Sequence, residues 1–128
     1  MGMDQTVEFV GRAVPAWAAV ADLLAREGFP AQLRMIDGQL ALPDEAPPEP
    51  WGELRVGTAQ GMVTLRRGAD RVVCVTWGNA DRALREAWNA LAWALAETGG
   101  GRVSTPEGPL EAAAFRQKAE LPAALHPG

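Results

Sequence analysis

The sequence predicts an α+β fold, a two-layer sandwich in which a mainly antiparallel sheet carries two long helices on one face. Three observations lead to this fold class. Two alanine-rich segments repeat apolar residues at helical spacing, several short segments alternate apolar and polar residues, and glycine-containing turns separate neighbouring short segments. At 128 residues the chain has the common size of one domain and can bury a single core.

The N-terminal third predicts a strand, a helix and a hairpin in that order. Residues 6–10 alternate as a short strand does. Residues 15–28 are typical of a helix, because a proline suits its first turn, a glycine suits its C-terminal cap and apolar residues share one face between them. Asp37-Gly38 is a pair preferred in type I′ turns, so residues 33–42 are expected to form a tight hairpin.

The middle of the chain predicts an exposed connection followed by three strands. Residues 43–50 hold four prolines and three acids, and this stretch should run over the surface because prolines cannot donate to a sheet. Strands are expected at about residues 53–58, 62–67 and 71–77. One face of this sheet should hold Leu54, Val56, Val63 and Leu65, and the other should hold Arg55, Thr64 and Arg66.

A second long helix is expected to follow these strands. It should begin at a cap formed by Asn79 or Asp81 and run to about Thr98, where three consecutive glycines stop it. A short last strand is expected at residues 102–104. The sheet and its two helices would then be complete.

The sequence predicts a boundary after this last strand. Residues 1–106 are expected to form the single α+β domain, and residues 107–128 are expected to form a C-terminal extension. Pro109 suits the start of a short helix that contains Leu110 and Phe115. The prolines near the end of the chain indicate a loose tail.

The two long helices resemble each other. Residues 16–28 align without a gap on residues 87–99, with Trp17 matched to Trp88. The alignment predicts equivalent buried positions for these two rings against the sheet. One interpretation is two β-α-β halves around one sheet, in an elaborated ferredoxin-like arrangement. The other is that alanine-rich amphipathic helices resemble each other by chance, and both interpretations give a two-layer sandwich.

Charge and composition argue against several classes of protein. The formal net charge is −4, whereas nucleic-acid binders usually carry a basic surplus, so no nucleic-acid partner is expected. No segment has the length of a membrane-spanning helix and the N-terminus lacks the order of a signal peptide. A cytoplasmic protein without a membrane partner is therefore expected. The preference for Arg over Lys, with many Ala and Gly residues, indicates a codon bias of the bacterial kind.

The sequence contains no recognisable catalytic or metal site. Cys74 is the only cysteine and His126 the only histidine, and a zinc site or a nucleophile with a histidine base needs more than these two distant residues. The glycines at residues 99–101 follow a helix instead of preceding one, so they indicate a helix stop and not a phosphate loop. No enzyme activity, metal or cofactor is therefore expected.

Two groups of charged residues are candidates for binding. Arg34, Arg55 and Arg66 are expected to share the open face of the sheet, where a row of guanidinium groups can hold an anion or a carboxylate. The alternative is that these arginines only keep an exposed sheet face soluble. Acids cluster between residues 37 and 53 without an intervening base. They fit either an acidic patch for a basic partner or a solvated proline-rich loop.

Trp93 is the most unusual residue of the second helix. Leu84, Trp88, Leu91 and Leu95 form one apolar stripe, and Trp93 points away from it among polar neighbours. Three interpretations stay open. The C-terminal segment with Leu110, Phe115 and Leu121 covers the ring, a partner or second subunit covers it, or the ring is exposed.

These features favour a small non-enzymatic protein-binding module of the toxin-neutralising, adaptor or regulatory type. Its candidate contact is a protein partner or a second copy of the chain at the face of Trp93, since Trp is enriched at interface hot spots. The alternative is a domain that binds a small molecule or an anion on its open sheet face through Arg34, Arg55 and Arg66.

Overall fold

The computed structural model describes residues 2–127, which form one antiparallel sheet of eight strands, three α-helices and a short 3₁₀ helix. The predicted α+β class is confirmed. The strands are β1 (Met3–Glu8), β2 (Gln32–Ile36), β3 (Gln39–Leu40), β4 (Glu53–Thr58), β5 (Gly61–Arg67), β6 (Arg71–Thr76), β7 (Arg102–Thr105) and β8 (Gly108–Glu111). The helices are α1 (Trp17–Arg26), α2 (Arg82–Gly99), α3 (Ala112–Lys118) and η1 (Ala123–Leu125). The order in the sheet is β3-β2-β4-β5-β6-β1-β7-β8.

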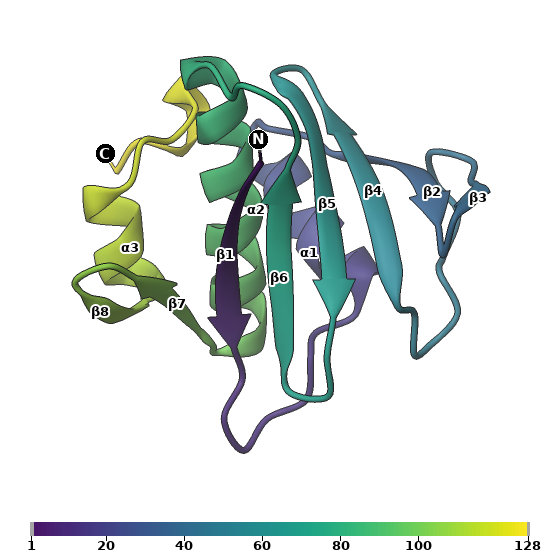
Figure 1. Ribbon diagram of the computed structural model, residues 1–128, viewed down its shortest axis with the longest axis horizontal. Helices are drawn as coiled ribbons and strands as arrows, with labels where there is room; N and C mark the ends of the chain where they lie inside the picture. The colour runs from purple at the N-terminus through teal and green to yellow at the C-terminus, as the bar shows by residue number, and fades with distance from the viewer. Residues whose placement is uncertain (1, 128) are drawn as a thin grey trace.

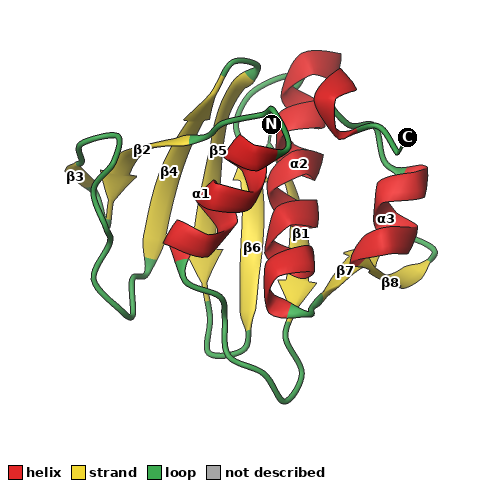
Figure 2. Cartoon of the chain, turned by 180° about the vertical axis from the view of Figure 1, so that it is seen from behind, coloured by secondary structure: helices red, strands yellow, loops and turns green. Residues whose placement is uncertain are grey.

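Both long helices lie on one face of the sheet, as predicted. Figure 1 views the sheet from the side that these helices leave open. Figure 2 views it from the other side and shows α1 and α2 in front of the strands. Side chains alternate along the strands between this core face and the opposite face. The core face supplies the fully buried residues Val7, Leu33, Leu54, Val56, Val63, Leu65, Val72 and Cys74.

The two crossovers each join strands that run in the same direction. β6 and β7 flank β1, and α2 connects them. β1 and β2 also run in the same direction, but three strands lie between them and α1 crosses over all three. Each long helix thus connects two strands in β-α-β order, as β1-α1-β2 and as β6-α2-β7. The ferredoxin-like arrangement stays a prediction, because one crossover spans three strands where that fold spans one.

Local sequence signals explain where several elements begin and end. Asp81 caps α2, since its side chain accepts a 2.9 Å hydrogen bond from the Leu84 backbone N–H. Gly100 ends the same helix in the left-handed conformation, with φ of 67°. Asp37 and Gly38 both have positive φ, as a type I′ turn requires.

Three elements differ from their predicted form. The first strand spans Met3–Glu8 instead of residues 6–10, because its pairing with β6 continues beyond the alternating segment. Pro109 lies in β8, which pairs with β7, and the short helix begins only at Ala112. The terminal residues expected to be loose form η1, where Leu125 is fully buried. Thus β8, α3 and η1 share the sheet and the core with the preceding chain.

Trp17 and Trp88 do not occupy equivalent positions, so that prediction is wrong. Trp17 is 5% exposed at the start of α1. Trp88 is only half-buried, and its indole N–H donates a 2.8 Å hydrogen bond to the Cys74 carbonyl in β6. Trp88 is less buried than Trp17 because β1 and β7 diverge beside it and a cavity opens between them.

Candidate functional site: the open face of the sheet

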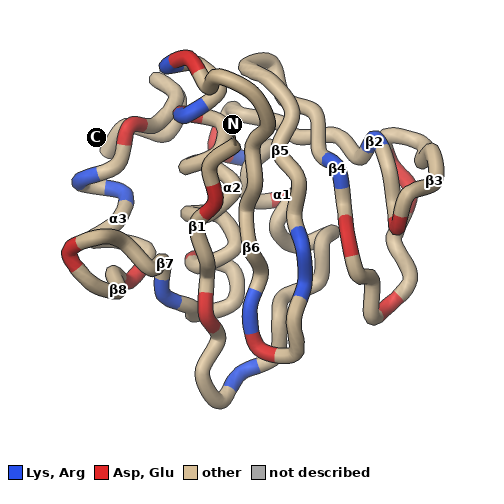
Figure 3. The backbone as a smooth tube through the Cα atoms, viewed as in Figure 1, with Lys and Arg blue, Asp and Glu red and all other residues tan. Residues whose placement is uncertain are grey.

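The face of the sheet opposite the helices, which we call the open face, is the candidate site. The register sets its side chains in two rows across β4, β5, β6 and β1. The first row is Glu53, Arg66, Val73 and Thr6, and the second is Arg55, Thr64, Val75 and Asp4. Figure 3 shows that arginines lie on β4 and β5 and acids on β1. The open face therefore has a mainly basic side, an apolar centre and an acidic side.

Trp77 follows directly after β6 and lies across the open face. Its indole N–H donates a 3.3 Å hydrogen bond to the Thr64 hydroxyl, and the Arg66 guanidinium lies 5.2 Å from the ring centroid. These contacts hold the ring over the neighbouring strand. As a result Thr64 is only 2% exposed, although its side chain points away from the helices. Trp77 itself is 56% exposed, so much of the fixed ring is accessible to a partner.

The structure brings the three predicted arginines onto this face. Glu53 lies 3.2 Å from Arg66 Nε and 3.7 Å from Arg55 Nε, so one carboxylate faces two guanidinium groups. Arg55 Nε is buried and has no hydrogen-bond acceptor among residues 2–127. Arg34, on β2, lies against Gly57 of the neighbouring strand β4. Its Nε would be only 2.7 Å from a Cβ added to that glycine, so the side chain crosses over β4. The basic side of the open face therefore has more cations than carboxylates.

Trp93 is 1% exposed, because the C-terminal segment covers the side of α2 on which it lies. The Arg116 guanidinium from α3 lies 4.7 Å from the centroid of the ring. The same group donates hydrogen bonds of 2.8 Å to the Leu125 carbonyl and 3.1 Å to the Glu27 carboxylate. Of the three interpretations for Trp93, cover by the chain itself is the one observed. The ring is therefore not on the surface of this chain.

The acids between Asp37 and Glu53 make contacts within the chain. Asp37 Oδ1 accepts hydrogen bonds of 2.8 and 2.7 Å from the backbone N–H groups of Gly52 and Glu53. Glu49 forms an ion pair with Arg67 at the end of β5. These contacts fasten the proline-rich connection to the sheet, and they favour the structural interpretation of the cluster.

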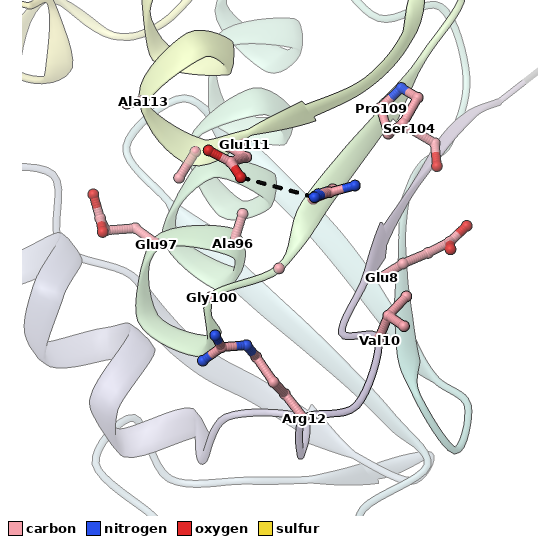
Figure 4. Close-up of a pocket in the computed structure, with 13 residues that line it drawn as sticks. Glu8, Val10, Arg12, Ala96, Glu97, Gly100, Ser104, Pro109, Glu111 and Ala113 are labelled. Carbon is pink, nitrogen blue, oxygen red and sulfur yellow. Dashed lines mark ion pairs between the residues drawn. The ribbon is translucent and has the colours of Figure 1, made fainter.

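A cavity of about 720 Å³ lies away from Trp77 (Figure 4). It lies beside the C-terminal end of α2 and is lined by charged residues of both signs. Arg12 packs against Gly100, where a cation interacts favourably with the carbonyl end of the helix. Arg102 lies 3.9 Å from Glu111. Both arginines of this cavity thus have contacts within the chain.

A second cavity, which we call the wedge, has a volume of about 410 Å³ and lies between β1 and β7. It exists because β1 pairs with β7 only at Val7 and Glu8, so the two strands separate beyond them. Its apolar lining includes Trp88, Leu110 and Phe115. The wedge therefore resembles a ligand pocket in size and lining.

Two further observations bear on chemistry. Cys74 is fully buried on the core face, and burial raises the pKa of its thiol to about 12, which leaves it unreactive near neutral pH. Within residues 2–127, three or more His, Cys, Asp or Glu side chains nowhere gather in a way that could hold a metal ion. In the same range, none of the helices is long and apolar enough to cross a membrane.

The chain matches no protein-family model, no curated protein and no solved structure. The open face is therefore the main guide to function. The sequence prediction for this face included Arg34, Arg55 and Arg66 but missed Trp77. Strand alternation carried the signal, because a residue two positions after Val75 points to the same face. The position of Trp77 over Thr64 depended on the register between strands.

Proposed function

We propose that the protein is a non-enzymatic protein-binding module and that its contact surface is the open face around Trp77. The fixed, half-exposed ring of Trp77 is the observation that carries this proposal. A ring already held by Thr64 and Arg66 loses little conformational freedom on binding. Trp and Arg are also the residues most enriched among interface hot spots.

The charges around Trp77 support a partner that presents a carboxylate next to an apolar group. Arg55 and Arg66 share the single carboxylate of Glu53, and Arg55 Nε lacks an acceptor among the described residues. The side chains of Arg55 and Arg66 are 44% and 50% exposed, so a carboxylate from a partner could accept charge-assisted hydrogen bonds from the exposed parts of their guanidinium groups. Apolar side chains of the partner would pack on Trp77 and Val73.

The test compares immobilised wild-type protein with Trp77→Ala and Arg66→Ala in capturing proteins from extracts of the source cells, quantified by mass spectrometry. A genuine partner should be captured about tenfold less by each variant. Val10→Ala and Arg26→Ala are matched controls, since they change an exposed apolar residue beyond the end of β1 and an exposed basic residue of α1, on the helix side of the molecule. Capture that is equal for all variants would contradict the proposal.

A second candidate function is binding of a small, mostly apolar molecule in the wedge. Its volume of about 410 Å³ lies within the usual range of ligand pockets, and half-buried Trp88 forms part of its lining. The probe is the hydrophobic dye ANS. Ala119→Leu fills the wedge and should abolish dye binding, whereas Ala114→Leu on the exposed side of α3 should leave it unchanged. Equal dye binding by both variants would exclude the wedge.

A further inference from the structure

We infer that the open face is the site at which a second copy of this chain packs, face to face, to form a four-layer dimer. This inference rests on the proposed function and names the partner. It is carried by the way charge is distributed over the open face. Asp4 lies at one end of its second row and Arg55 at the other, with uncharged Thr64 and Val75 between them.

A two-fold axis parallel to the strands makes this row complementary to itself. If the axis runs between β5 and β6, β1 of each copy lies over β4 of the other. Asp4 then meets Arg55 of the second copy, and Val75 meets Thr64. Each contact occurs twice, because a two-fold interface is isologous. Two twisted sheets commonly pack face to face in this aligned way, about 10 Å apart.

The neighbouring residues fit the same arrangement. In the first row, Thr6 would lie over Glu53 and Val73 over Arg66, so no two like charges face each other. The Arg55 side chain is 44% exposed, and the exposed part of its guanidinium would gain the Asp4 carboxylate. Trp77 follows β6 beside the axis, and its exposed surface would be covered by the second sheet. An unrelated partner would have to supply this charge order, whereas the chain already contains it.

Charge reversal tests the pairing of Asp4 with Arg55. Wild type should sediment at twice the mass of one chain. Asp4→Arg places two guanidinium groups together at both ends of the interface, and Arg55→Glu places two carboxylates together there. Each variant should therefore dimerise roughly a hundredfold more weakly. Asp44→Arg makes the same charge change in the exposed proline-rich connection and should remain dimeric.

Mixing the two variants gives the decisive result. In a mixed dimer, the arginine introduced by Asp4→Arg would meet the glutamate introduced by Arg55→Glu, and the unchanged Asp4 and Arg55 would meet at the other end. An equimolar mixture should therefore form mixed dimers that native mass spectrometry resolves. Circular dichroism checks that both variants remain folded.

A monomeric wild type, or dimers that survive in both variants, would overturn the inference. The capture experiment then separates this failure from that of the proposed function. If Trp77-dependent capture of another protein persists, the proposed function stands with a different partner. If that capture is also absent, both fail.

Discussion

Replacing Arg116 by alanine should destabilise the protein by about 3 kcal/mol. Its guanidinium lies over the buried ring of Trp93, where a desolvated cation–π contact contributes about 1–2 kcal/mol. Its Nε donates to the Leu125 carbonyl at 2.8 Å, a charged hydrogen bond of about 1.5 kcal/mol. The ion pair with Glu27 is partly exposed on both sides, so screening limits it to about 0.5 kcal/mol.

Equilibrium unfolding in urea, followed by tryptophan fluorescence, measures this loss. For a chain of this size the melting temperature should fall by about 10 °C, and opening of the cover over Trp93 should shift its emission to longer wavelength. Arg82→Ala is the matched control, because Arg82 also forms two ion pairs but is 71% exposed, and it should cost under about 1 kcal/mol. Equal losses for the two variants would refute the assigned role of Arg116.

Three further outcomes are expected. Trp93→Ala should cost about 3–5 kcal/mol, whereas Trp77→Ala, at a half-exposed ring, should cost about 1 kcal/mol; similar losses in unfolding experiments would contradict this difference. Gly99→Ala should destabilise by about 1–3 kcal/mol, because a Cβ would lie 2.5 Å from Phe9 Cε1; a gain of stability, as helix propensity alone predicts, would contradict the close packing. Burial raises the pKa of Cys74 from 9.0 to about 12, so the protonated thiol stabilises the fold fully below pH 9. That contribution should fall by about 1.4 kcal/mol per pH unit above pH 9, and the fall should be absent in Cys74→Ala.

The sequence by itself determined the elements whose cause is local. Strand β4 begins and ends at the predicted residues, because alternation and flanking turn residues act within a few positions. The turn at Asp37-Gly38 and the cap at Asp81 also depend only on residues within one turn of the chain. The prediction of which residues of β4 and β5 point to the core was correct for the same reason, since side chains alternate between the two faces along any strand.

Only the tertiary structure decided which surfaces are covered. The helical wheel gave the direction of Trp93 relative to its own helix, but not that Arg116, on a later helix, would close over it. The near-repeat predicted like positions for Trp17 and Trp88, yet the separation of β1 from β7 left Trp88 only partly buried. Trp77 became part of the candidate site through the register of β5 against β6. Burial and the meeting of distant side chains depend on how whole elements pack, and residues far apart in the sequence contribute to that packing together.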